Sequence, residues 1–330
     1  MAEKRRDVFL VAALAIVAFS LLAFVAALPG QSQSVSHAAP PAAQAQLPPQ
    51  QQTASESSTR LTAETRPRGN TPPPAPVASS STGALYVSAA QQNATLMGGL
   101  NWLFGGKQQR GWYLYTSLIQ QTLGTDRDAA TGDFAQALSR WQAGAGLAPT
   151  GVLDNDTWFK MFSTWQGDRI KNKAYPLPSQ LLTAPVTDFW DTSRPSELRQ
   201  VEREAYAAYK RMVAAAVADK SLGLAATPEG ELAPDEKYLK IVSAFRSREY
   251  QEQLRRQSPN AGSAGLAKNS PHFTGRALDL YVGGEPVETK DSNRALQVQT
   301  PAYRWLVRNA ERFGFRPYYY EPWHWEYVGN

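Results

Sequence analysis

The sequence predicts an α+β protein, and three observations support this. Apolar residues recur at helical spacing in the middle of the chain, at 112–123, 133–142 and 155–165. Short runs typical of strands follow at 238–245 and 277–282. The N-terminal quarter differs, because one long apolar run is followed there by a stretch without any aromatic residue. The 330 residues therefore offer room for about two folded domains behind an N-terminal region of another kind.

The first segment, residues 1–28, is predicted to be a membrane anchor. Three basic residues at 4–6 precede an apolar run from 8 to 28, in which Ser20 is the only polar residue. A helix needs about 20 residues to cross a bilayer, and the positive-inside rule places the rest of the chain outside the cytoplasm. A cleaved signal peptide is the alternative, although its apolar core usually measures about 7–15 residues. Both interpretations predict that the protein is exported.

Residues 29–83 are predicted to form a disordered linker. They hold ten of the 23 prolines and no aromatic residue, and Gln, Ala, Ser and Thr dominate the remainder. Such a composition cannot bury enough apolar surface to offset the entropy of ordering. His37 lies in this linker, and we expect it to be inert.

Residues 84–168 are predicted to form a small helical domain. A set of its residues has a characteristic order and spacing over about 113–165: Leu118, Gln120, Phe134, Ala137, Leu138, Trp141, Gln142, Gly146, Leu147, Thr150, Gly151, Val152, Leu153, Asp154, Thr157 and Trp158. This pattern resembles the peptidoglycan-binding domain found beside many wall hydrolases, and the resemblance implies binding of glycan or stem peptide. The first loop departs from the family pattern because it lacks the usual Asp-Gly turn, and we interpret the large apolar members as core residues.

A connector at 169–194 leads to the last predicted domain, at 195–330. A long helix is expected from Pro195 to Asp219, since proline suits a first-turn position. A strand at 238–245 and a polar helix at 247–256 follow. The residues of the long helix expected to face a core are Ala205, Ala208, Met212 and Ala216.

The composition restricts which chemistry this domain can carry out. The chain has no cysteine, which excludes disulfides, thiolate zinc ligands and a cysteine nucleophile. Besides His37, the chain has only His272 and His324, so chemistry that needs imidazole depends on these two. The net charge of +5 is spread without a dense basic stripe. A nucleic-acid partner needs such a stripe, so none is expected.

Both histidines lie in short motifs with carboxylates. Asp279 lies seven positions after His272. The predicted strand at 277–282 places Asp279 on the same face as the small Ala277. Near the C-terminus, Glu321 and His324 flank a Pro-Trp pair and can point into one cleft. Two imidazoles and a carboxylate form a three-ligand zinc site that leaves a position open for water. The sequence therefore predicts a zinc site at His272, Asp279 and His324.

Further residues are candidates for the chemistry around this metal. Glu321 is the candidate base that takes a proton from water and passes it to the leaving amine. Arg246 is a candidate for stabilising an oxyanion or holding a substrate carboxylate. The candidate substrate contacts are Arg246, Ser247, Ser270 and Trp323.

Two other interpretations concern neighbouring residues. A Ser–His–Asp triad that uses Ser270 is an alternative, but it leaves Glu321 and His324 without a role. Glu326 is interpreted as a surface salt-bridge partner, and Trp323 and Trp325 as packing residues or pocket walls.

The motif S-x-H-x-x-G-x-A-x-D, followed by E-P-W-H, resembles the VanY-type D-alanyl-D-alanine carboxypeptidases. These zinc peptidases are related to VanX, to lysostaphin-type enzymes and to the hedgehog domain. The preceding S-A-F-R-S is similar to the family's S-G-Y-R-S, with Ala244 and Phe245 as departures, and Gln251 matches a frequent glutamine. The tyrosine hydroxyl of the family motif is therefore absent at Phe245.

The resemblance covers about 195–330 and implies a small antiparallel sheet with flanking helices. It implies zinc ligands at His272, Asp279 and His324, a catalytic base at Glu321, and a role for Arg246 in transition-state stabilisation or substrate anchoring. The expected function is removal of the terminal D-alanine from peptidoglycan stem peptides, with membrane contact through the N-terminal helix. An L,D-carboxypeptidase, an endopeptidase and a non-catalytic, zinc-stabilised wall-binding scaffold are the alternatives. The oligomeric state is not indicated by the sequence.

Overall fold

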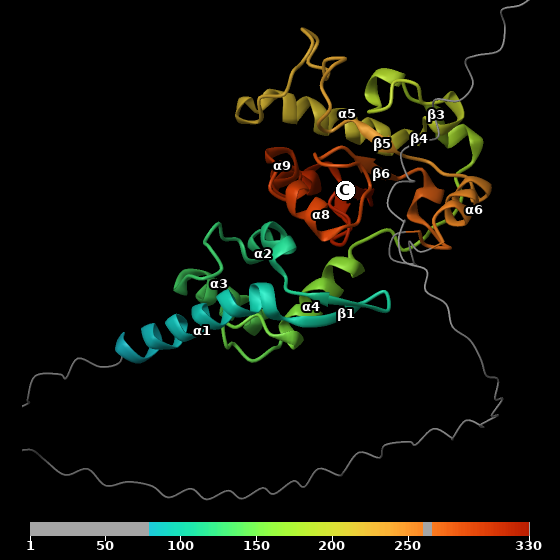
Figure 1. The fold of residues 1–330 in the computed structure, drawn as a ribbon. Coiled ribbons are helices and arrows are strands. Elements are labelled where there is room, and N and C mark those ends of the chain that lie inside the picture. The colour runs from blue at the N-terminus through green and yellow to red at the C-terminus, as the bar shows by residue number, and fades with distance from the viewer. Residues whose placement is uncertain (1–78, 260–265, 330) are drawn as a thin grey trace, which may run out of the picture. The chain divides into compact units, whose positions relative to one another are not determined.

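The computed structural model describes residues 79–259 and 266–329 (Figure 1). The predicted anchor at 1–28 lies outside this part of the chain, as does nearly all of the predicted linker at 29–83. Within the described residues, no helix is both long and apolar enough to cross a membrane.

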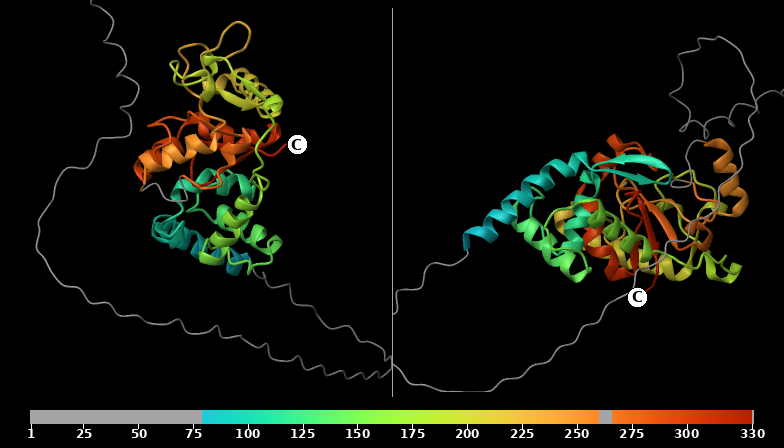
Figure 2. Two further views of the ribbon diagram at one scale, coloured as in Figure 1. Left: turned by 90° about the vertical axis from the view of Figure 1, so that its right-hand side faces the viewer. Right: turned by 90° about the horizontal axis from the view of Figure 1, so that it is seen from below.

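The N-terminal part of the described chain consists of helices and one hairpin. In chain order these are α1 (Ser79–Gly99), β1 (Asn101–Phe104), β2 (Lys107–Arg110), α2 (Thr116–Leu123), α3 (Gly132–Gly144) and α4 (Asn155–Gly167). Figures 1 and 2 show α1, α3 and α4 grouped together. The three helices predicted from apolar spacing are confirmed as α2, α3 and α4, with a 3-10 turn at Tyr113–Tyr115 leading into α2. Neither α1 nor the hairpin was predicted from the sequence.

Several residues of the peptidoglycan-binding-like motif have structural roles in this part. The buried Gln142 accepts a hydrogen bond from Gly151 N (2.8 Å) and donates to Val152 O (3.0 Å) and Thr157 Oγ1 (2.9 Å). Gly151 has φ +72°, and a Cβ there would lie 2.7 Å from Ala135 O, so the turn requires glycine. The motif therefore explains how this part folds. Glycan or stem-peptide binding by it stays a prediction.

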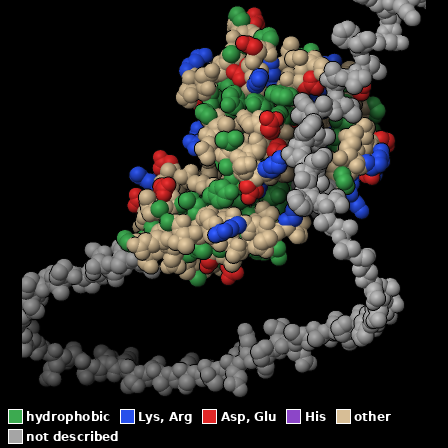
Figure 3. All heavy atoms as spheres, in the orientation of Figure 1, with side chains coloured by type: hydrophobic (Ala, Val, Ile, Leu, Met, Phe, Trp, Pro, Cys, Tyr) green, Lys and Arg blue, Asp and Glu red, His purple; other side chains and the backbone are tan. Residues whose placement is uncertain are grey.

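The C-terminal part combines helices with short strands, which agrees with the predicted α+β class. Its elements are β3 (Leu181–Thr183), β4 (Gln200–Glu202), α5 (Arg203–Ala218), β5 (Ile241–Ser243), α6 (Arg248–Gln257), β6 (Ala277–Leu280), α8 (Asp291–Gln297), α9 (Pro301–Asn309), β7 (Phe315–Pro317) and β8 (His324–Tyr327). Helices α8 and α9 were not predicted. Side chains of both charges are interspersed over the face drawn in Figure 3.

The predicted helix from Pro195 to Asp219 is wrong over its first third. Residues 196–198 form a single 3-10 turn, and Gln200–Glu202 form β4, which pairs with β3 in antiparallel fashion. Helix α5 begins only at Arg203, because the Glu202 side chain caps it by accepting from Ala205 N (2.9 Å). The predicted core face is confirmed, since its four residues are fully buried: Ala205, Ala208, Met212 and Ala216.

A four-stranded antiparallel sheet, in the order β5-β6-β8-β7, forms the centre of the C-terminal part. The small antiparallel sheet that the sequence predicted is thereby confirmed. Strand β5 is shorter than the predicted strand at 238–245. Leu239 adopts φ +66°, which is left-handed backbone, and this interrupts the extended conformation two residues before the strand begins.

Tyr319, in the segment just before Glu321, packs against the helical part of the chain and is only 2 % exposed. Its ring centroid lies 5.2–6.5 Å from the rings of Trp102, Phe104, Tyr115, Trp158, Phe162 and Trp165. The buried Arg294 adds hydrogen bonds to Tyr115 OH (3.2 Å) and Tyr320 O (3.1 Å). The helical part therefore holds the backbone that leads into Glu321.

Candidate metal centre

The register of the sheet aligns three polar residues in one row. Asp279 on the central strand β6 is the Cα partner of Ser243 on β5 and of His324 on β8. Directly opposed residues of an antiparallel pair point to the same face of the sheet. Strand pairing alone therefore brings Asp279 and His324 together, although they are 45 positions apart.

His272 reaches this row from a 3-10 turn at Pro271–Thr274. The Ser270 hydroxyl begins the turn by accepting from His272 N (3.3 Å), and Gly275 ends it in the left-handed conformation with φ +68°. A Cβ at Gly275 would lie 3.0 Å from Glu202 N, so glycine also permits the close approach of β4. These contacts explain the spacing of the S-x-H-x-x-G motif.

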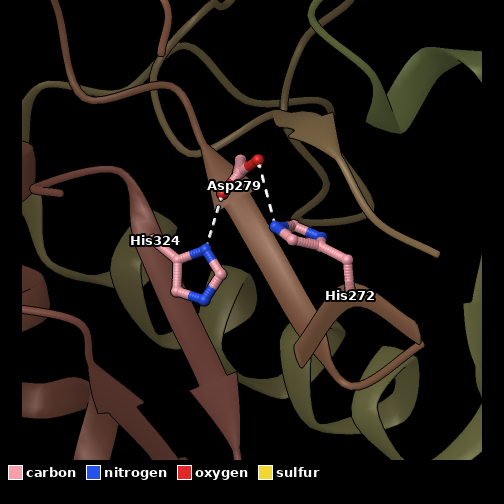
Figure 4. Close-up of side chains that lie close together, drawn as sticks. All are labelled: His272, Asp279 and His324. Atoms are coloured by element: carbon pink, nitrogen blue, oxygen red, sulfur yellow. Dashed lines mark hydrogen bonds and ion pairs between the residues drawn. The ribbon is translucent and has the colours of Figure 1, made fainter. Parts of the chain in front are cut away.

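His272, Asp279 and His324 form a buried cluster (Figure 4). One potential ligand atom from each residue lies within 4.8 Å of the others. His272 Nε2 is 3.3 Å from Asp279 Oδ2, and His324 Nδ1 is 2.9 Å from Asp279 Oδ1. Each of the three residues is at most 3 % exposed. The structure thus brings together the three residues that the sequence predicted as metal ligands.

The state of His272 fits a metal ligand. Its Nδ1 lies 2.6 Å from Ala244 O, which can only accept, so this nitrogen carries the proton and Nε2 presents a lone pair toward the cluster. Burial lowers the pKa of His272 to about 4, with the charge of Arg246 adding to the effect. The imidazole is therefore neutral at physiological pH, which is the form that binds a metal.

His324 lies between two carboxylates. Its Nδ1 faces Asp279, and its Nε2 lies 3.1 Å from Glu326 Oε1. Burial alone would lower the pKa of His324, but the hydrogen bonds with Asp279 and Glu326 raise it to about 9. A metal-bound histidine commonly donates its other N–H to a carboxylate, and Glu326 is placed to accept that hydrogen bond.

The interpretation of Glu326 as a surface residue is wrong, because its exposed fraction is zero. Arg169, at the start of the connector, donates to Glu326 Oε1, and Ile170 N donates to Oε2 (2.8 Å). Burial would raise the pKa of Glu326, but the hydrogen bond with His324 and the charges of His324 and Arg169 lower it to about 2.

Arg246 lies within the cluster, as its motif suggested. Its Nε donates to Ser243 Oγ (2.9 Å), and its Nη2 donates to Asp279 Oδ2 (2.5 Å). Burial would raise the pKa of Asp279, but the interactions with His272 and Arg246 hold it well below its usual range. Asp279 is therefore a carboxylate anion at any physiological pH, with oxygen atoms available to a cation.

Glu321 stands beside the cluster without being part of it. Its Oε2 lies 3.9 Å from His324 Nδ1, which is longer than a hydrogen bond. The residue is 7 % exposed, and burial raises the pKa of its carboxyl to about 8. A carboxyl with this pKa can accept and release a proton near neutral pH, as general acid–base work requires.

The other candidate substrate contacts have structural partners. Ser247 caps α6 by accepting from Tyr250 N (3.1 Å), and Ser270 caps the turn that carries His272. Trp323 is buried in the hydrophobic core. Contact of these three residues with substrate stays a prediction.

Sequence analysis missed Glu326 and Arg169 as residues of the site. Strand alternation could have found Glu326, because residues two apart on a strand share a face and Glu326 follows His324 by two. Arg169 has no such indication in the sequence, since it lies 157 positions from its partner.

A buried His–Asp–His cluster with a glutamate beside it is the kind of site that metal-dependent hydrolases use. Residues 198–330 match the family model of VanY, D-alanyl-D-alanine carboxypeptidase. The C-terminal part of the chain is therefore a VanY-like carboxypeptidase domain, and the resemblance seen in its motifs is confirmed. No curated protein matches the chain.

Proposed function

We propose that this chain is an exported, zinc-dependent D-alanyl-D-alanine carboxypeptidase that removes the terminal D-alanine from peptidoglycan stem peptides. The observation that carries the proposal is the cluster of His272, Asp279 and His324, whose ligand atoms lie within 4.8 Å of one another in the VanY-like domain. Two imidazole nitrogens and a carboxylate oxygen are the donor set of a catalytic zinc site.

Each residue of the site has a separate task. His272 Nε2, His324 Nδ1 and an Asp279 oxygen hold the metal. A zinc ion in this position supplies a Lewis acid and lowers the pKa of water. Glu321 accepts the proton of the attacking water and delivers it to the amine of the leaving D-alanine. Arg246 presents a guanidinium that can stabilise negative charge on the peptide oxygen or hold a substrate carboxylate.

The rest of the chain keeps the peptidase near its substrate in this proposal. The apolar segment at 1–28 anchors it to the membrane, the segment at 29–83 serves as a tether, and the helical part at 84–168 binds peptidoglycan. The VanY-like domain, which acts on cell-wall peptides in this family, supports an envelope location.

Digestion of defined stem peptides tests the reaction. The purified zinc-loaded chain is incubated with a pentapeptide ending in D-alanyl-D-alanine and with the corresponding tetrapeptide, and the products are weighed by mass spectrometry. We expect loss of one alanine from the pentapeptide only, abolished by a chelator and by Asp279→Asn. Loss of alanine from the tetrapeptide would indicate an L,D-carboxypeptidase, and internal cleavage an endopeptidase. Two intact peptides would contradict an enzymatic role and favour a wall-binding scaffold.

A further inference from the structure

Glu326 is held by residues that lie outside the segment matched by the VanY family. Its Oε1 accepts from Arg169 Nε (2.9 Å) and from a second Arg169 nitrogen, and its Oε2 accepts from Ile170 N (2.8 Å). The same Oε1 faces His324 Nε2 at 3.1 Å. One buried carboxylate therefore links the connector to a proposed zinc ligand.

Arg169 is itself fixed in place on two sides. Its guanidinium lies over the Tyr318 ring, 3.8 Å from the ring centroid. Its Nη1 donates to Gln166 Oε1 (2.8 Å) in α4. The Tyr318 ring in turn meets the His324 ring edge-on at 5.8 Å. The arginine side chain is only 16 % exposed, so little water competes for its hydrogen bonds. A side chain held in this way can orient Glu326 rather than only neutralise it.

From these contacts we propose that Arg169 is a positioning residue of the metal centre, which acts through Glu326 on His324. The inference rests on the proposed zinc site. Without Arg169, Glu326 Oε1 loses the two N–H donors that fix its position. The acceptor that holds the His324 ring and its tautomer is then no longer fixed. Carboxylates of this kind behind a metal-bound histidine commonly contribute 10–100-fold to metal affinity.

With Arg169 as part of the metal centre, the functional peptidase begins before the segment that the family model matches. The family match starts at residue 198, but the arginine that orients Glu326 is the first residue of the connector. The connector therefore contributes to the active site and does not only join two domains.

Zinc affinity of the full-length protein tests the proposal by competition with a chromophoric chelator. We expect Arg169→Ala to weaken zinc binding about 10–100-fold. It is also expected to alter the visible absorption spectrum of the cobalt-substituted protein, which reports ligand geometry. Arg169→Lys keeps the charge but offers only one donor nitrogen where arginine places two on Glu326 Oε1, so an intermediate loss is expected. Arg140→Ala, an exposed arginine on α3, is the matched control and should bind zinc as the wild type does.

A double-mutant cycle separates this role from general destabilisation. If Arg169 acts through Glu326, Arg169→Ala should weaken zinc binding little further in the Glu326→Gln background. Additive losses, or an Arg169→Ala protein with wild-type affinity and spectrum, would overturn the proposal. If Arg169→Ala fails to fold, Arg169→Lys replaces it in the cycle and shows whether the losses of zinc affinity are additive. Zinc binding that survives the Asp279→Asn substitution would instead refute the metal site, and the inference with it.

Discussion

Two buried glutamates lie on either side of His324, and their surroundings differ. Glu326 interacts with Arg169, Ile170 N and His324, and its pKa is lowered to about 2. Glu321 lies 3.9 Å from the same imidazole, beyond hydrogen-bond distance, and burial raises its pKa to about 8. The same residue type is therefore a fixed anion on one side of the histidine and, on the other, a carboxyl whose pKa lies near neutral.

The difference shows that partners, and not burial, decide what a carboxylate in this site can do. Both glutamates are removed from water, which favours the protonated form of each. Glu326 accepts hydrogen bonds from Arg169 and from Ile170 N, whereas the charges of His324, Arg246 and Arg169 offset the burial of Glu321 only in part. A carboxylate fixed in this way can orient a ligand, whereas a less constrained carboxyl with a pKa near neutral can exchange protons.

The largest expected effect belongs to Glu321. Glu321→Gln should lower kcat about 10²–10⁴-fold, because proton transfer by a positioned group contributes about that much. Zinc content, measured by atomic absorption, should stay at the wild-type level, since Glu321 is not a proposed ligand. Glu326→Gln is the matched control within the same site. A Glu321→Gln protein that still turns over at a tenth of the wild-type rate would contradict a role of Glu321 in proton transfer.

Glu326→Gln should act on the metal instead. We expect zinc affinity to fall about 10–100-fold, because the acceptor that holds His324 Nε2 loses its charge. When zinc is saturating, kcat should fall much less than it does in Glu321→Gln. Isothermal titration with zinc and kinetics at saturating zinc measure the two quantities. Unchanged affinity together with a collapse of kcat would mean that the two roles are reversed.

The two glutamates should shift the stability of the metal-free protein in opposite directions. Ionised Glu326 stabilises the fold above its ordinary pKa of 4.5, and this contribution is lost as the pH falls toward 2. Ionisation of Glu321 costs stability as the pH rises from 4.5 toward 8. At pH 8, Glu326→Gln should therefore lower the free energy of unfolding and Glu321→Gln should raise it, each by about 1–3 kcal/mol. Urea unfolding at pH 5 and pH 8 provides the test, and shifts of the same sign would argue against it.

The smallest expected effect is that of Tyr319→Phe, in the segment that leads into Glu321. Tyr319 packs among aromatic rings, and its hydroxyl is buried without a hydrogen-bond partner among the described residues. Tyr319→Phe should therefore leave the unfolding free energy within about 0.5 kcal/mol or raise it, because an unsatisfied polar group is removed. Tyr319→Ala should cost about 3–5 kcal/mol through the cavity it leaves. Thermal and urea unfolding of both variants show whether packing or hydrogen bonding matters at this position.

Much of the site could be predicted because its residues lie in short motifs. The spacing of His272 and Asp279, and of Glu321 and His324, indicated one cluster, and the sheet register explains why it forms. The start of α5 could not be predicted, since residues 200–202 pair with a strand about 20 positions earlier. Arg169 was missed for the same reason. Its role depends on a contact between distant parts of the chain, which no local pattern records.

The most direct test of the account is D-alanine release from the stem pentapeptide by zinc-loaded wild-type and Glu321→Gln proteins, with bound zinc measured in the same samples. The account predicts that the wild type releases one D-alanine per peptide, and that Glu321→Gln binds equal zinc but releases D-alanine at least about 100-fold more slowly. Equal rates at equal zinc content would contradict it.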